Sequence, residues 1–171
     1  DYGHGLLTKK IRNLIVKKSK FLSVNAQLNS TNYGFHTISK YSHSNTVCMH
    51  EGELRHDLRM KSEDINAVIK KLSTKIKSKN IFVTRGKNGA VKYTNNTFTY
   101  CPAFNMGFKD KVGAGDAFFG IISLCSEGKF SSELTILLGN IFGYLAVNTI
   151  GNSSPITKKE LYSIIKGLIS S

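Results

Sequence analysis

The sequence predicts an α/β fold built on a mostly parallel sheet. Short apolar segments with the length of buried strands occur at positions 21–24, 46–49 and 81–84. Apolar residues recur every three or four positions from 65 to 76, which predicts a helix between two of these strands. Strands that alternate with helices in this way pair in parallel, so we expect ligands to bind at their carboxyl ends.

The N-terminal elements follow from capping residues and apolar spacing. Thr8 is placed to cap a first helix, and the polar stretch 25–32 predicts a loop after the first strand. Ser62 is placed to cap the helix over 65–76. The apolar face of the first helix consists of Ile11, Leu14 and Ile15, and that of the second of Ile65, Val68, Ile69, Leu72 and Ile76.

The segment after the third strand predicts a turn and a β-hairpin. Residues 85–89 contain two glycines directly after the strand at 81–84. The segments 90–93 and 97–100 then flank Asn95-Asn96, a pair that favours a tight hairpin turn. We therefore expect the sheet to end in this hairpin.

Three helices are predicted in the remainder of the chain. The first runs over 116–127 and is closed by Gly128, and the second covers 133–150. Thr157 and Glu160 have the spacing of a capping box that begins a last helix.

Length, composition and charge limit the class of protein. The chain has 171 residues, of which 40% are apolar, enough for one domain with a sizeable core. The net charge of +13, from 24 basic and 11 acidic residues, would suit a nucleic-acid-binding domain. The lysines are spread along amphipathic segments, however, where a solvated helix face explains them better. We therefore expect no nucleic-acid partner. The hypothesis of a nucleic-acid-binding domain rests on charge alone.

The cysteines and the most apolar segment indicate a cytoplasmic protein. Cys48, Cys101 and Cys125 are odd in number and far apart, which is typical of reduced thiols. The stretch 134–150 is short for a membrane span and contains polar Asn140, so a buried helix is expected. No charged region followed by an apolar run opens the chain, which predicts no signal peptide.

The candidate catalytic residues lie in and directly after the glycine-rich turn before the helix at 116–127. Gly113, Ala114 and Gly115 allow backbone N–H groups to approach an anion closely at a helix N-terminus. Asp116 would repel phosphate there, but it suits a base that draws a proton from an attacking hydroxyl. Alternatively, Asp116 merely occupies the favourable first turn of a helix.

A second motif favours the catalytic interpretation. Residues 83–90 form a strand, a glycine-rich turn and another strand, and residues 110–118 read Asp-Lys-Val-Gly-Ala-Gly-Asp-Ala-Phe. Together they resemble the nucleotide loop and the C-terminal signature of the ribokinase-like (PfkB) carbohydrate kinases. The resemblance implies a three-layer α/β/α sandwich with a mostly parallel sheet and a terminal β-hairpin. It also implies ATP-dependent phosphorylation of a sugar or sugar-phosphate hydroxyl.

The resemblance assigns roles to individual positions. It makes Asp116 the catalytic base and the amides of Gly113, Ala114 and Gly115 the anion hole. The nucleotide contacts that it implies are Thr84, Arg85, Gly86, Lys87, Gly89, Gly115 and, near the adenine, Asn140. The positions that correspond to a monovalent cation site, K⁺ in character, are Asp110, Val112, Thr149 and Gly151.

The family pattern is looser upstream. Members usually carry an Asn-x-x-Glu motif that helps to place Mg²⁺ and phosphate, and residues 50–53 occupy that place. Glu53 matches the acid, so we expect it to act on Mg²⁺ indirectly, but His50 replaces the asparagine. Imidazole is a poorer partner than oxygen for Mg²⁺, so the metal geometry is expected to differ. Asn25 also stands where many relatives have an acid.

Residues 1–5 indicate a branch of the family and the part of the kinase domain to which the chain corresponds. Residues 1–5 resemble a mid-chain segment of heptose-phosphate kinases, the kinase half of enzymes that make nucleotide-activated heptose. Residues 1–171 would then be the C-terminal part of a ribokinase-like domain, without most of the sugar-recognition half. An open sheet edge would favour association, for example as a homodimer. The alternative to catalysis is a nucleotide-binding or regulatory fragment.

Overall fold

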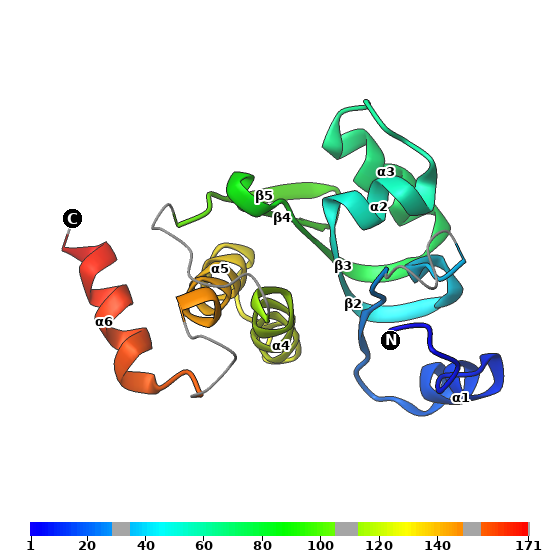
Figure 1. Cartoon of the computed structure of the whole chain (residues 1–171), viewed down its shortest axis with the longest axis horizontal. Coiled ribbons are helices and arrows are strands. Elements are labelled where there is room, and N and C mark those ends of the chain that lie inside the picture. Colours follow the sequence, from blue (N-terminus) through cyan, green and yellow to red (C-terminus); the bar gives the residue numbers. More distant parts are fainter. Residues whose placement is uncertain (29–34, 105–112, 149–154, 171) are drawn as a thin grey trace. The chain divides into compact units, whose positions relative to one another are not determined.

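A computed structural model describes residues 1–28, 35–104, 113–148 and 155–170 (Figure 1). The chain divides into two compact units. The first, which we call the sheet unit, consists of Asp1–Arg85 and Ala90–Tyr100. The second, which we call the helical unit, consists of Gly86–Gly89 and Cys101–Ser171.

The five strands form one sheet in the order β1-β2-β3-β4-β5. Strands β1, β2 and β3 are parallel, and β4 pairs with β3 in the antiparallel direction. This mixed, mostly parallel sheet with a hairpin at one side confirms the predicted topology. The strands are β1 Ser23–Asn25, β2 His43–His50, β3 Lys77–Thr84, β4 Ala90–Thr94 and β5 Thr97–Cys101.

The sheet buries side chains on both faces, as expected for parallel strands. Val47 and Val83 lie on the face that joins the main apolar cluster. Cys48 and Phe82, which alternate with them along β2 and β3, are equally buried. The buried parts of these strands, residues 47–49 and 81–83, are therefore continuous apolar runs rather than alternations.

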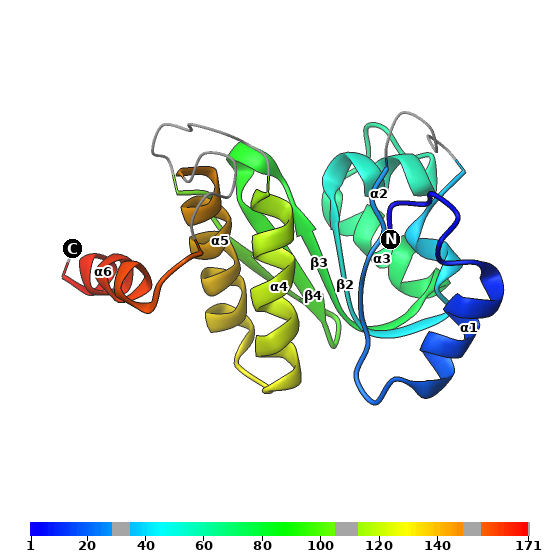
Figure 2. The ribbon, with the colours of Figure 1, turned by 60° about the horizontal axis from the view of Figure 1, so that its bottom comes forward.

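Helices α2 (Glu51–Leu58) and α3 (Ile65–Lys75) pack beside β2 and β3 in both views (Figures 1 and 2). Leu54 and Leu72 are fully buried in the main apolar cluster. The periodicity of the sequence predicted α3 correctly. Its predicted cap, however, was wrong: the helix begins after Asp64, whose carboxylate accepts hydrogen bonds from the N–H groups of the first turn.

Helix α1 (Lys9–Lys18) is capped by Thr8, as predicted, but none of its residues is buried. Leu14 is 55% exposed and Ile11 is 38% exposed. A short 3₁₀ turn at Ile38–Lys40 precedes β2.

The helical unit contains α4 (Ala114–Glu127), α5 (Ser132–Asn148) and α6 (Lys158–Ile169). Helices α4 and α5 pack against each other, and the predicted capping box of Thr157 and Glu160 begins α6. The last two residues of the predicted 133–150 helix lie outside the described residues. Among the helices described, none combines the length and apolarity needed to cross a membrane.

Candidate functional site

The carboxyl ends of the three parallel strands bring predicted site residues to one edge of the sheet. Asn25 ends β1, His50 ends β2 and Thr84 ends β3. His50 pairs directly with Thr84, and the Asn25 amide donates to the carbonyl of Cys48, 3.1 Å away. This edge is where ligands bind in open parallel sheets.

His50 and Glu53 form a reciprocal cap at the start of α2. The Nδ1 atom of His50 accepts the Gly52 N–H at 3.0 Å, and Glu53 Oε2 accepts the His50 N–H at 2.7 Å. The other Glu53 oxygen accepts the N–H of Leu28 at 3.1 Å. Both carboxylate oxygens of Glu53 are therefore already used by backbone donors, which fixes the orientation of the group.

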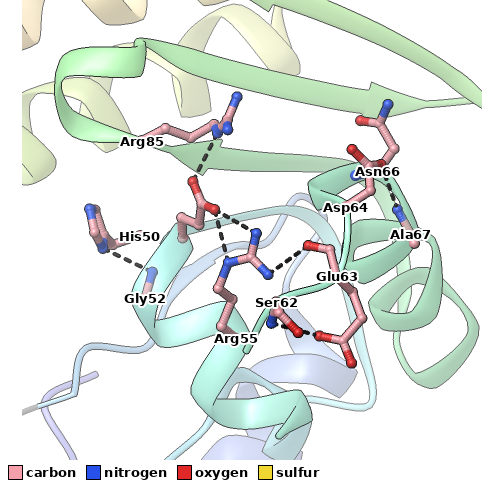
Figure 3. Close-up of polar contacts among 10 residues, drawn as sticks. His50, Gly52, Arg55, Ser62, Glu63, Asp64, Asn66, Ala67 and Arg85 are labelled. Atoms are coloured by element: carbon pink, nitrogen blue, oxygen red, sulfur yellow. Dashed lines mark hydrogen bonds and ion pairs between the residues drawn. The ribbon is translucent and has the colours of Figure 1, made fainter. Parts of the chain in front are cut away.

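Glu51, next to this cap, binds two arginines, Arg55 and Arg85, which Figure 3 labels. Its Oε1 atom accepts from Nε of Arg55 at 2.9 Å, and Nη2 of Arg55 lies 2.8 Å from the same oxygen. Its Oε2 atom accepts from Nε of Arg85 at 2.9 Å. Arg85 directly follows β3, so Glu51 ties the start of α2 to the end of that strand.

The two arginines control the ionisation of Glu51. Partial burial by itself would raise the pKa of this carboxyl. The hydrogen bonds and positive charges of Arg85 and Arg55 outweigh burial and hold the pKa below its ordinary value. Glu51 is therefore a carboxylate at neutral pH.

The predicted nucleotide loop runs from Thr84 to the start of β4. Gly86–Asn88 form a 3₁₀ turn, and the Gly89 N–H donates to the Gly86 carbonyl at 3.0 Å. Lys87, within this turn, is exposed. The loop is therefore a tight turn whose tip is open to solvent.

Gly89 and Asn140 meet the same piece of backbone in the helical unit. A β-carbon on Gly89 would lie 2.0 Å from the carbonyl oxygen of Cys101, and φ at this glycine is +77°. The Asn140 amide nitrogen donates to the Cys101 and Pro102 carbonyls, at 3.2 and 2.9 Å. Asn140 thus holds the segment against which the predicted nucleotide loop packs.

The predicted catalytic loop begins α4. Gly113 is the N-cap with φ of +86°, a conformation that favours glycine, and it provides no side-chain cap. The Ala114 and Gly115 N–H groups belong to the first turn, and they have no acceptor among the residues described. Asp116 is exposed in the same turn. This arrangement provides N–H donors and a carboxylate side by side.

The cation positions Asp110, Val112, Thr149 and Gly151 lie outside the described residues. The sequence analysis missed Glu51, although its i, i+4 spacing to Arg55 was a visible signal. It also missed the role of the Cys101–Pro102 carbonyls, which no side chain could signal.

Solved structures share this fold. The phosphofructokinase-2 of Escherichia coli in complex with potassium is 16% identical, with a TM-score of 0.76 over 94% of this chain and 52% of that chain. A putative ribokinase II from E. coli in complex with ATP and Mg²⁺ is 20% identical, with a TM-score of 0.75 over 93% of this chain and 53% of that chain. The fold is therefore ribokinase-like α/β, as predicted.

Sequence relatives and a family profile give the classification. The bifunctional protein HldE of Campylobacter jejuni is 25% identical over 90% of this chain and 33% of its own length. The chain thus spans about a third of the length of this curated relative. The profile of the pfkB family carbohydrate kinases matches residues 4–159. The chain belongs to the pfkB family of carbohydrate kinases.

Proposed function

We propose that this protein transfers a phosphoryl group from ATP to a hydroxyl of a sugar or sugar phosphate. The observation that carries the proposal is the α4 N-terminus, in a chain matched by the kinase family over residues 4–159. The turn at Gly113 leaves N–H donors beside Asp116. Donors for a moving phosphoryl group and a nearby base are the parts that this reaction needs.

Asp116 is proposed as the general base. Its carboxylate accepts the proton of the acceptor hydroxyl while that oxygen attacks the γ-phosphorus of ATP. The bond from the γ-phosphorus to the bridging oxygen breaks, and ADP leaves. The N–H groups of Gly113, Ala114 and Gly115 donate to the oxygens of the transferred group, where negative charge must be stabilised.

The nucleotide contacts are proposed at the loop after β3 and at α5. Thr84, Arg85, Gly86 and Lys87 offer hydroxyl, guanidinium, backbone and ammonium donors. Gly89 allows the loop to pack closely on Cys101. Asn140 supports that packing and is proposed to lie near the adenine.

Mg²⁺ fits this chain through water rather than by direct ligation. Both oxygens of Glu53 accept backbone N–H groups, and Nδ1 of His50 is used by Gly52. Mg²⁺ retains several waters in such sites, and those waters can donate to the remaining lone pairs of Glu53. When bound with ATP, the ion would neutralise phosphate charge. A K⁺ site at Asp110, Val112, Thr149 and Gly151 remains a prediction.

A sugar phosphate is the favoured acceptor class. The resemblance of residues 1–5 to heptose-phosphate kinases supports it, as does the excess of basic residues. We also propose that the whole protein is an active kinase, that it forms homodimers and that it is cytoplasmic.

The second candidate is a nucleotide-binding module without catalysis. It is favoured by His50, which stands in place of the usual asparagine and is used as a helix cap. Such a module would bind ATP through the loop after β3 but would transfer no phosphoryl group.

One experiment separates the two candidates. The chain is incubated with ATP, Mg²⁺ and a panel of sugars and sugar phosphates, and ADP formation is measured beside ATP binding. Acceptor-dependent ADP formation supports the kinase. Binding of ATP with no ADP formed on any acceptor, also in a version extended by the segment that corresponds to the relatives' N-terminal half, supports the binding module.

A further inference from the structure

Among the residues that the structure describes, the guanidinium of Arg85 is held at one of its nitrogens. Its Nε atom donates to Oε2 of Glu51 at 2.9 Å. Within the described ranges, no acceptor is bonded to its two terminal nitrogens. An arginine binds planar or tetrahedral anions through two parallel N–H groups, and the Nη1–Nη2 edge of Arg85 retains that capacity.

Glu51 is itself held in place by Arg55. Arg55 contacts one Glu51 oxygen through Nε and Nη2, and its Nη1 donates to the carbonyl of Glu63 at 2.9 Å. The Glu51 and Arg85 side chains are 19% and 22% exposed, so the contact is partly shielded from water. Glu51 therefore offers Arg85 a fixed partner rather than a mobile surface charge.

The cluster of Glu51, Arg55 and Arg85 carries more positive than negative charge. Two guanidinium groups share one carboxylate, which leaves a net charge of +1. All three nitrogens of Arg55 contact Glu51 or Glu63, whereas among the described residues Arg85 contacts Glu51 through Nε alone, so both of its terminal nitrogens keep their donors. An arginine that served only to neutralise Glu51 would be superfluous, because Arg55 already does so.

The position of Arg85 in the fold favours a phosphate group as the anion that it binds. Arg85 directly follows Thr84, at the carboxyl end of a parallel strand, and precedes the tight turn of Gly86–Asn88. Ligands bind at the carboxyl ends of the strands in open parallel sheets, and a guanidinium there offers a phosphate group a bidentate contact.

We propose that Arg85 binds a phosphate group end-on through Nη1 and Nη2, and that Glu51 is the residue that positions it. The proposal rests on the proposed function, since it describes the phosphate site of the same reaction. The phosphate belongs either to the nucleotide or to a phosphorylated acceptor. In either case Arg85 contacts the phosphate through the same two terminal nitrogens.

A purely structural role makes different predictions. If Glu51 and Arg85 only tie α2 to β3, then removing either should lower stability without a specific effect on phosphate binding. If Glu51 acts only as a negative charge near the site, then its neutralisation should strengthen phosphate binding. A positioning role predicts the opposite sign, and only while Arg85 is present.

The test measures binding of ADP, tripolyphosphate, adenosine and sedoheptulose 7-phosphate by calorimetry. The full chain is compared with Arg85→Ala, Arg85→Lys, Glu51→Gln and the Glu51→Gln/Arg85→Ala double variant. Arg59→Ala is the matched control, because it removes one positive charge at the other end of α2. Thermal unfolding of each variant shows that the protein measured is folded.

Arg85→Ala should weaken binding of ADP and tripolyphosphate about 10- to 100-fold, the range for hydrogen bonds to a charged group, and leave adenosine unchanged. Arg85→Lys should not restore binding, because one ammonium cannot serve Glu51 and a bidentate phosphate together. Glu51→Gln should weaken ADP binding when Arg85 is present and have no effect in the double variant. A loss confined to sedoheptulose 7-phosphate supports the site and assigns the phosphate to the acceptor.

Unchanged binding of every phosphate in Arg85→Ala would overturn the proposal, and so would tighter ADP binding in Glu51→Gln. A wild-type chain that binds none of these phosphates would overturn it as well. Failure of this inference can be told apart from failure of the kinase proposal. Sugar phosphorylation with unchanged phosphate binding in Arg85→Ala removes this inference alone, whereas weakened binding without any turnover supports it and removes the kinase.

Discussion

Gly89 lies so close to Cys101 that a β-carbon at position 89 would meet the Cys101 carbonyl oxygen at 2.0 Å. The backbone of the next residues is also near, since Pro102 C and Ala103 N would both lie 2.7 Å away. Contacts this short involve rigid main chain rather than a flexible side-chain end. The proposed nucleotide loop and the segment after β5 therefore pack closely because Gly89 has no side chain.

Gly89→Ala should disrupt this contact and the loop. The variant adds the clash with Cys101 to the strain of a positive φ, which alone costs about 1–3 kcal/mol. Gly86→Ala is the comparison, because φ there is +55° but nothing lies within 4 Å of an added β-carbon. Chemical denaturation should show a larger loss of unfolding free energy for Gly89→Ala. Equal losses in the two variants would contradict the close approach.

Asn140→Ala should loosen the same region from the other side. Two hydrogen bonds to the Cys101 and Pro102 carbonyls are lost, each worth about 0.5–1.5 kcal/mol net. Both the unfolding free energy and the affinity for ADP should fall, since the loop at Gly89 packs on this backbone. Asn140→Asp should do no better, because a carboxylate cannot donate to a carbonyl. Weaker ADP binding at unchanged stability would instead indicate that Asn140 acts only by touching the nucleotide.

His50→Asn should keep the helix cap and change the response to Mg²⁺. Asparagine is a strong N-cap, so α2 should remain stable, whereas His50→Ala should lose about 0.5–2 kcal/mol. An amide oxygen is also a better partner than imidazole for Mg²⁺ and its waters. The measurement is ATP turnover as a function of Mg²⁺ concentration. The Mg²⁺ concentration that gives half-maximal turnover should be lower in His50→Asn than in wild type. An identical Mg²⁺ titration would place residue 50 away from the metal.

Acid should remove the contribution of Glu51 to stability. Its folded-state pKa is below the ordinary value, because the hydrogen bonds from Arg85 and Arg55 outweigh partial burial. A lowered carboxyl pKa adds stability at pH above the ordinary value of about 4.3, and this is lost as pH falls through the folded-state pKa. The difference in unfolding free energy between wild type and Glu51→Gln should therefore shrink from pH 7 toward pH 3. A difference independent of pH would mean that the ion pairs contribute nothing.

The elements that the sequence predicted best have strong local signals. The spacing of Ile65, Val68, Ile69 and Leu72 fits a single helical face, and all four are buried. Asn95 and Asn96 have φ of 48° and 61°, the left-handed values that the hairpin turn requires. These features depend on neighbours within a few residues, so they can be read without the tertiary structure.

The strand boundaries were predicted less well, because tertiary contacts decide them. Strand β2 begins at His43 rather than at 46, and it includes Ser44, which is buried and donates to the Ser78 hydroxyl at 3.2 Å. Strand β3 begins at Lys77, before the apolar run that predicted it. Polar residues enter these strands because a neighbouring strand satisfies them, and a pattern of apolar residues cannot show that.

The candidate site was predicted where glycine and acid occur together and missed where distant residues meet. Gly113 and Asp116 lie together at the start of α4, in a motif of consecutive residues. Glu51 and Arg85 are 34 positions apart, and only the pairing of β2 with β3 brings them within 2.9 Å. Their contact is a consequence of the fold rather than of any local pattern.

The central claim, that Asp116 is the base for phosphoryl transfer, is tested most directly by Asp116→Asn. Asparagine keeps the size of the side chain and removes its ability to accept the hydroxyl proton, so kcat should fall about 10²- to 10⁴-fold, the usual contribution of a general base. ADP affinity and thermal stability should stay close to wild type. Glu127→Gln, which removes one carboxylate at the other end of the same helix, is the matched control and should retain activity. ATP-dependent sugar phosphorylation at the wild-type rate in Asp116→Asn would contradict the account.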